Sequence, residues 1–253
     1  MGASTTTRTC WPPGAAWRRI ARRRRCGCQR YLQCERADSV RLLRLAEACG
    51  YRAIVVTVDA PVNGIRNAEQ RAGFGVDAVD LRGFRMPRAS AGPGQSPVFM
   101  GLLDDAPTWQ DIRRLRRQTT LPLLLKGIMD GADAQHALDC GIDGIIVSHH
   151  GGRTLDTLPA SLEGLPDIVQ RVAGKVPVLI DGGIRHGTDV VKALALGADA
   201  VLIGRPYLYA LAVAGPLGVA HLLTLLRAEL EVAMTLTSRR TLDEIDAGTI
   251  RSA

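Results

Sequence analysis

Five short apolar runs dominate this 253-residue sequence, and each one ends in polar or charged residues. Each run has the length of a single β-strand. A strand buried on both faces is apolar throughout, which is typical of a parallel sheet covered by helices. The runs therefore predict a parallel sheet with strands in AIVVTVD at 53–59, LPLLLKG at 121–127, GIIVSHH at 144–150, PVLIDGG at 177–183 and AVLIGRP at 200–206.

Helical periodicity fills the spaces between these runs. Asp38 can cap a helix whose apolar residues Val40, Leu43 and Ala46 recur at helical spacing, and Gly50 follows as a stop. Further helical stretches lie near residues 131–140, 162–173, 188–197 and about 216–237. Strands that alternate with helices place the chain in the α/β class.

The polar residues are confined to the carboxyl ends of the predicted strands. This is typical of a (β/α)8 TIM-type barrel, whose active site is built from those ends. Only five clear strands are present, and the segment at 26–33 is a poor sixth. A complete barrel has eight strands, and the missing two or three would precede this segment. We therefore expect an incomplete barrel over residues 29–253, equivalent to the C-terminal two-thirds of the fold.

One connection is much longer than an ordinary loop of this fold. About sixty residues separate Asp59 from Leu121, and residues 75–105 within them are rich in Gly, Pro and Ser. We expect this insertion to be mobile. Two interpretations stay open, a lid over the active site and an insertion without function.

Residues 1–28 differ in composition from the rest of the chain. The first 34 residues hold eight arginines and no acid, so the net charge of +7 leaves −1 for the remaining residues and gives no sign of nucleic-acid binding. The segment matches a mitochondrial transit peptide or a myristoylation signal loosely. We favour a mis-started reading frame in GC-rich DNA, because only three of the 32 basic residues are lysines.

The rest of the sequence has the features of a soluble cytoplasmic protein. Only Cys49 and Cys140 lie beyond residue 34, so no disulfide framework is expected. No run approaches the roughly 18 uninterrupted apolar residues of a spanning helix, and we predict no membrane span. Cys26 and Cys28 have no second ligand pair nearby, so we predict no metal site.

Two adjacent strand ends near the C-terminus predict a phosphate-binding site. Glycines let backbone amides approach a phosphate closely, arginines add charge, and the last strands of such barrels often bind phosphate. Tight turns with surface arginines are the alternative. The residues concerned are Asp181, Gly182, Gly183, Arg185, Gly204 and Arg205.

His150 and Arg153 place a candidate base and a candidate anion clamp at one rim. The neighbouring His149 is expected to point to the other side of an extended chain, so the two histidines cannot easily share a metal. Arg66 is either a second clamp or a solvated loop arginine. Lys126 ends an apolar strand and could form a Schiff base, balance an anionic cofactor or reach solvent.

The segments VVTVDAP, LPLLLKG, IIVSHHGGRTLD, LIDGGIRHGTDVVKALALGAD and LIGRP together resemble the FMN-dependent α-hydroxy acid oxidase and dehydrogenase family. This family includes glycolate oxidase, lactate oxidase, mandelate dehydrogenase and flavocytochrome b2. The likeness keeps the family's order and covers roughly residues 29–246. The His-Gly-x-Arg element and Arg66 point to hydroxy acids, whereas DGGIR and IGRP alone also resemble other phosphate-binding barrels.

The resemblance implies FMN as the cofactor and a small 2-hydroxy acid as the substrate, oxidised to a 2-oxo acid. It implies that His150 is the catalytic base, that Asp59 stabilises its protonated form, and that Lys126 stabilises the reduced flavin. The substrate contacts that it implies come from Tyr31, Arg66, His150 and Arg153. The other implied cofactor contacts are Gln29, Thr57, Ser148, Asp181, Gly182, Gly183, Ile184, Arg185, Gly204 and Arg205.

The sequence also departs from the family. His149 stands where the family usually has Asn, Arg30 stands where an apolar residue is usual, and the family's N-terminal portion is not recognisable in residues 1–28. Three hypotheses follow: a working flavin oxidoreductase, a truncated and inactive member, or another FMN- or phosphate-binding barrel enzyme. For the first, the resemblance implies O2 or a quinone or cytochrome chain as electron acceptor, and a homotetramer.

Overall fold

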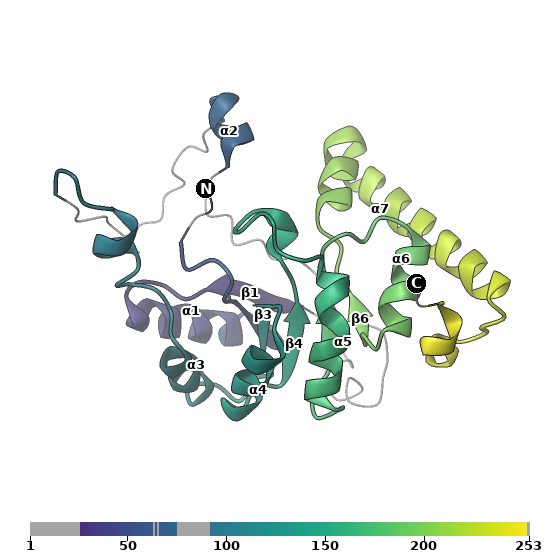
Figure 1. The fold of residues 1–253 in the computed structure, drawn as a ribbon, viewed down its shortest axis with the longest axis horizontal. Helices are drawn as coiled ribbons and strands as arrows, with labels where there is room; N and C mark the ends of the chain where they lie inside the picture. The colour runs from purple at the N-terminus through teal and green to yellow at the C-terminus, as the bar shows by residue number, and fades with distance from the viewer. Residues whose placement is uncertain (1–25, 63, 65, 75–91, 252–253) are drawn as a thin grey trace.

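The computed structural model describes residues 26–62, 64, 66–74 and 92–251. Its centre is one parallel sheet of six strands in the order β1-β2-β3-β4-β5-β6 (Figure 1). Every neighbouring pair in the sheet is consecutive in the chain and parallel. The strands are β1 (Gly27–Tyr31), β2 (Ala53–Thr57), β3 (Leu123–Ile128), β4 (Gly144–Val147), β5 (Val178–Ile180) and β6 (Ala200–Val201).

The sheet confirms the α/β class and the incomplete barrel. All five predicted runs form strands, and the segment at 26–33, the poor sixth, forms β1. Among the described residues, β1 pairs only with β2 and β6 only with β5, so the barrel is not closed. The Arg-rich segment at residues 1–28 falls almost entirely in residues 1–25, which lie outside the described residues.

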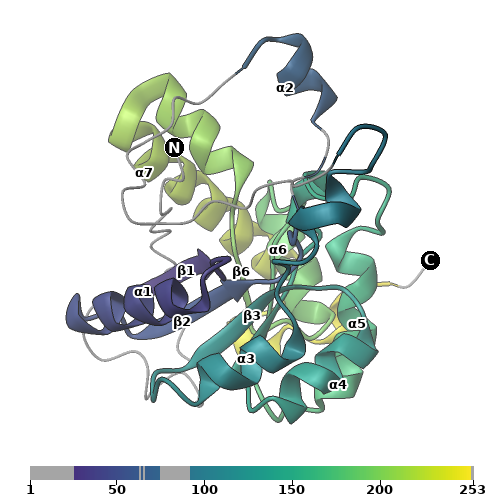
Figure 2. The same cartoon turned by 90° about the vertical axis from the view of Figure 1, so that its left-hand side faces the viewer.

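Helices cover the outer face of the sheet. Alternate strand residues such as Ile54, Leu125 and Ile145 are fully buried and pack with Leu43 and Ile168 from the helices. In both views α1, α3 and α4 lie together beside the sheet, whereas α2 stands apart from them (Figures 1 and 2). The α-helices are α1 (Arg36–Ala48), α2 (Asn67–Arg71), α3 (Trp109–Arg116), α4 (Gly131–Asp139), α5 (Ser161–Val172), α6 (Gly187–Ala195) and α7 (Arg205–Leu236).

A smaller apolar cluster fills the inner face. Its members are the strand residues in between, including Val55, Leu124, Ile146 and Leu179. Successive residues of a strand point to opposite faces, so the polar residues two positions farther along also belong to the inner face. Those residues are Thr57, Lys126, Ser148 and Asp181.

Two details of the helices correct the sequence predictions. Asp38 was expected to cap its helix, but α1 begins at Arg36 after Glu35, and Asp38 pairs instead with Arg41 at 3.2 Å. The last helix was expected to begin near residue 216. It begins at Arg205, with non-helical backbone angles at Ala214 and Gly215 that divide it just before Pro216.

The helix α7 also bears on the expectation of no membrane span. By length and average hydropathy it is the one helix in the described part of the chain that could cross a bilayer. The prediction concerns an uninterrupted apolar run, and His221 and Thr224 interrupt the run in this helix. Helices of this composition also occur in soluble proteins. The absence of a membrane span therefore stays a prediction.

The long connection between β2 and β3 contains local structure that the sequence did not predict. It includes α2, α3 and one π-helical turn, Val98–Leu102. Thr108 and Asp111 cap α3 reciprocally, which explains where that helix begins. Residues 75–91 of the predicted lid at 75–105 lie outside the described residues, so the lid stays a prediction.

Candidate active site

His150 lies at the centre of a cluster of polar side chains at the carboxyl ends of the strands. Its Nδ1 is 2.9 Å from Asp59 Oδ1, and its Nε2 is 3.4 Å from the Tyr31 hydroxyl. His150 follows β4, Asp59 follows β2 and Tyr31 is the last residue of β1, so the parallel sheet brings together groups far apart in the sequence. With the Nδ1 proton donated to Asp59, Nε2 is left with a lone pair on the side of Tyr31.

The backbone after β4 turns the His150 ring toward this cluster. The chain does not stay extended there, as the sequence prediction supposed, but forms a 3-10 turn over His150–Gly152. His150 itself has a φ of +55°, and both following glycines also have positive φ. His149 turns the other way, its Nδ1 lying 2.6 Å from Ser161 Oγ, so the two rings have different partners.

Gly127 gives Asp59 its place beside the histidine. Its φ is +106°, and a Cβ built on it would lie 2.5 Å from Asp59 Cβ and Cγ. A residue with a side chain would therefore displace the carboxylate that orients His150. The pairing of β3 with β4 shifts by one residue at this point, between Lys126 and Ile128.

The two candidate clamp arginines approach each other across different loops. Arg66 precedes α2, Arg153 follows the turn after His150, and both contact Glu69. A Cβ on Gly64 would lie 2.6 Å from the carbonyl oxygen of Arg153, so the two loops pack backbone to backbone. The clamp pair therefore needs a glycine as well as the arginines.

Tyr31 lies within the electrostatic influence of Asp59 and of both arginines. Burial raises the pKa of its phenol, the negative charge of Asp59 raises it further, and the charges of Arg66 and Arg153 act in the opposite direction. These four side chains come from the end of β1 and from the loops after β2 and β4. Their combination suits a ligand that carries both a carboxylate and a hydroxyl group.

Lys126 is buried beside Ser148 and Asp181. Its Nζ lies 2.7 Å from Ser148 Oγ and 3.0 Å from Asp181 Oδ2, and the residue is only 5% exposed. An ammonium group has three N–H donors, of which these contacts use two. Burial and ion pairing remove the interpretation of Lys126 as a side chain reaching solvent.

Several polar atoms in this region lack partners among the described residues, as a cofactor site would require. Asp181 Oδ1, Asp59 Oδ2 and Arg66 Nε are buried without a hydrogen bond. Thr57 Oγ1 accepts a hydrogen bond from Gln29 Nε2 at 3.0 Å. Buried carboxylate oxygens need donors, and the hydroxyl groups of a ribityl chain are such donors. The residues present therefore fit FMN.

The predicted phosphate-binding residues lie around the ends of β5 and β6. Gly182 and Gly183 both have positive φ, and a Cβ on Gly182 would meet the His149 ring at 2.6 Å. Arg205 begins α7 and reaches the carbonyl oxygen of Gly151 at 3.4 Å, which links the end of β6 to the turn after β4. Among the others, Ile184 is buried, whereas Arg185 and Gly204 are exposed.

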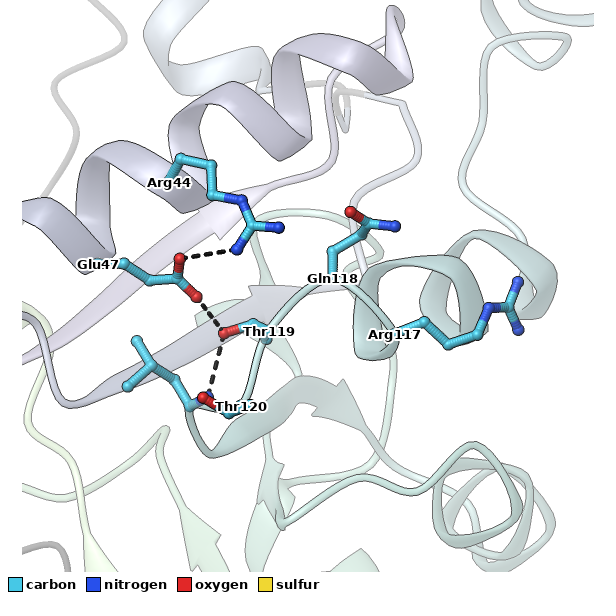
Figure 3. Close-up of a pocket in the computed structure, with 7 residues that line it drawn as sticks. Arg44, Glu47, Arg117, Gln118, Thr119 and Thr120 are labelled. Carbon is cyan, nitrogen blue, oxygen red and sulfur yellow. Dashed lines mark hydrogen bonds and ion pairs between the residues drawn. The ribbon is translucent and has the colours of Figure 1, made fainter.

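A hollow elsewhere on the molecule has no part in this cluster. Its lining includes residues 117–121, just before the amino end of β3, whereas His150 follows the carboxyl end of β4. Figure 3 shows the residues that line it. Glu47 accepts hydrogen bonds there from Thr119 at 2.6 Å and from Arg44 at 3.0 Å. Glu47, Thr119 and Arg44 are thus paired with one another, and we assign the hollow no ligand. The described residues contain no cluster of three or more His, Cys, Asp or Glu that could hold a metal.

Comparison with known proteins decides the family. The sequence profile of the family described as FMN-dependent dehydrogenase matches residues 15–252. The chain belongs to this family. FMN, the cofactor predicted from the sequence, is confirmed as the cofactor on which the family depends.

Named relatives agree with this assignment. The chain is 47% identical over 223 residues to an L-lactate oxidase of Roseobacter sp., covering 86% of this chain and 60% of that protein. It is 41% identical to human 2-hydroxyacid oxidase 1 over 232 residues, covering 88% and 63%. A crystal structure of a mandelate oxidase bound to a hydroxyphenylpropionic acid derivative matches with a TM-score of 0.73 and 41% identity, covering 87% and 61%. The chain thus spans about three fifths of its relatives' length.

One residue of this region was not predicted from the sequence. Glu69 contacts both candidate clamp arginines, yet it lies on α2, away from any strand end. The only signal available was its spacing from Arg66, which on a helix would place the two side chains together.

Proposed function

We propose that this chain binds FMN and oxidises a small 2-hydroxy acid to the corresponding 2-oxo acid. The observation that carries the proposal is the His150 ring, which contacts Asp59 at Nδ1 and the Tyr31 hydroxyl at Nε2. The names of the relatives, which are lactate and 2-hydroxyacid oxidases, support the same substrate class.

His150 is proposed as the base. Either of the two possible routes, hydride transfer or a carbanion, requires a proton to leave the substrate near its 2-hydroxy carbon. Nε2 takes that proton, and the imidazolium that forms is stabilised by the Asp59 carboxylate on the other side of the ring. Tyr31 holds the substrate's oxygen on the Nε2 side.

Arg66 and Arg153 are proposed to hold the substrate carboxylate. Two guanidinium groups from separate loops fix the orientation of a carboxylate better than one, because each oxygen receives its own charge-assisted hydrogen bond. Orientation of this kind supplies much of the gain from holding reactants together.

FMN supplies a two-electron acceptor when it is bound. Lys126 would place its positive charge against the part of the flavin that becomes negative, and Gln29, Thr57 and Ser148 would hydrogen-bond the ring. The phosphate and ribityl groups would be held by Asp181, Gly182, Gly183, Ile184, Arg185, Gly204 and Arg205.

Several finer points belong to the same proposal. The relatives' names as oxidases favour O2 as the electron acceptor over a quinone or cytochrome chain. A homotetramer and a cytoplasmic location stay predictions, and relatives include proteins named as peroxisomal oxidases. The second candidate, a member that binds FMN weakly and has no turnover, stays a hypothesis that the flavin-reduction test below distinguishes from the first.

The test is flavin reduction by single 2-hydroxy acids. The chain is loaded with FMN, mixed without oxygen with L-lactate, glycolate or (S)-mandelate, and followed by stopped-flow absorbance. General-base catalysis typically contributes about 10²- to 10⁴-fold, so His150→Ala should slow flavin reduction by that range. His136→Ala, an exposed histidine on α4, is the matched control and should leave the rate unchanged.

Each negative result has its own meaning. If His150→Ala reduces FMN at the unmodified rate, the base is assigned wrongly, and the preference over other phosphate-binding barrel enzymes loses its main support. If the unmodified chain binds FMN and none of the three acids reduces it, the inactive fragment is the better description.

A further inference from the structure

Arg66 and Arg153 already share a carboxylate, and it belongs to the protein. Arg153 Nη2 lies 2.9 Å from Glu69 Oε1, and Arg66 Nη1 lies 3.3 Å from Glu69 Oε2. Each oxygen of Glu69 therefore serves one arginine. The same division of contacts is expected for the carboxylate of a bound 2-hydroxy acid.

The Glu69 side chain is charged in this arrangement. Partial desolvation opposes its ionisation, but hydrogen bonds and the positive charges of Arg153 and Arg66 outweigh it and lower the pKa of the carboxyl. At neutral pH the arginine pair is thus occupied by an anion with the functional group of the proposed substrate.

The helix that carries Glu69, α2, is not packed into the protein core. The helix α2 has five residues, none of which is buried, and it stands apart from the other helices (Figure 1). Among the described contacts, the bond from Glu69 to Arg153 is the ion pair that ties α2 to the loop after β4. An exposed ion pair of this kind is weak, so an incoming anion can replace it.

We propose that Glu69 is an internal placeholder for the substrate carboxylate. It bridges Arg66 and Arg153 when the site is empty of substrate, and the carboxylate of a 2-hydroxy or 2-oxo acid displaces it. The inference rests on the proposed function, since it assumes that the two arginines are the carboxylate clamp. An incoming anion would then have to compete with Glu69 for the two arginines. This competition would select ligands whose second functional group also contacts Tyr31 and His150.

Binding of pyruvate tests this without turnover, because a 2-oxo acid is not oxidised by the proposed reaction. Isothermal titration of the full chain with pyruvate is compared between the unmodified protein and Glu69→Gln. Loss of the competing charge should tighten pyruvate binding by about three- to tenfold. Glu231→Gln, which removes an exposed charge that pairs with Arg227 on α7, is the matched control and should change nothing.

The sign of the change separates the placeholder from a simpler role. If Glu69 only held the arginines in position, Glu69→Gln would weaken pyruvate binding, and that result or an unchanged affinity overturns the inference. Lactamide, which lacks the carboxylate, should bind equally to both proteins. If Glu69→Gln binds pyruvate where the unmodified chain shows none, the placeholder is supported, and if neither binds, it is refuted.

A third protein keeps the proposed function and the inference apart. Arg153→Met should weaken pyruvate binding by about tenfold or more, with or without the Glu69 substitution. If Arg153→Met has no effect, the clamp itself is wrong and the proposed function loses its substrate site. If Arg153→Met weakens binding and Glu69→Gln does not strengthen it, only the placeholder fails.

Discussion

Arg30 carries a charge into the layer between β1 and its covering helix. It lies between Gln29, which contacts Thr57 on the inner face, and Tyr31, which contacts His150, so its own side chain points to the outer face. The residue is 9% exposed, its Nη1 reaches Ser39 O at 3.4 Å, and its Nε has no partner among the described residues. Burial lowers the pKa of this guanidinium.

Replacing this charge should stabilise the protein. Arg30→Met keeps much of the volume and removes the cost of burying a poorly paired charge, so the free energy of unfolding should rise by about 1 kcal/mol. Urea unfolding followed by circular dichroism measures it. Arg41→Met, at an exposed position of α1, is the control and should stay near the unmodified value. A less stable Arg30→Met protein would mean that the Ser39 contact outweighs the desolvation.

Residues at strand ends could be predicted from the sequence, and residues that act through loop contacts could not. Carboxyl ends of parallel strands meet at one edge, so the sequence alone is enough to group Asp59, Lys126 and His150. Glu69 and Gly64 act through contacts between the loops after β2 and β4. The positions of these residues in the sequence do not indicate that the two loops lie in contact.

At the scale of one element, β3 depends on Gly127. Alanine there would meet Asp59 atoms at 2.5 Å in a backbone conformation with a φ of +106°. Gly127→Ala should therefore lower the free energy of unfolding by about 2–3 kcal/mol and, in FMN-loaded protein, slow flavin reduction by moving Asp59 away from His150.

A control variant at Gly50 separates the effect of backbone strain from the effect of the contact with Asp59. Gly50 has a φ of +76°, and a Cβ built there would meet nothing within 4 Å. Gly50→Ala should cost about 1 kcal/mol from backbone strain alone and leave flavin reduction unchanged. Equal losses of stability in the two variants, with no change in the rate, would show that contact with Asp59 is unimportant.

The start of α7 is a helix boundary that the sequence prediction placed wrongly. The sequence predicts a helix start near residue 216, and the backbone does break there, at Gly215. Helical geometry nevertheless begins at Arg205, separated from β6 by three residues, where Pro206 in the first turn is a start signal that the sequence prediction did not use. The strand β1 is hard to recognise because its sequence, GCQRY, mixes polar inner residues with a buried arginine.

At the scale of the whole molecule, the sheet has two outer strands. Among the described residues β1 and β6 each pair on one side only, and β6 is two residues long. An eight-stranded barrel joins such edges through further strands, and its closed rim holds the loops that surround the site. Gln29 and Tyr31 lie on one of these outer strands, so the flavin contacts expected of them depend on an edge with one neighbour.

Completing the sheet should therefore strengthen FMN binding. The segment of the Roseobacter L-lactate oxidase that precedes its match to this chain can be fused upstream of Gln29. Added strands beside β1 would hold the ring-binding residues in place before the cofactor arrives, so the Kd for FMN should fall by about tenfold or more. Titration by quenching of flavin fluorescence gives the Kd, and fusion to an unrelated soluble domain of the same length is the control. Stoichiometric, tight FMN in the chain without the added segment would show that the edge at β1 already holds its residues well enough, and that the flavin site depends on the six described strands alone.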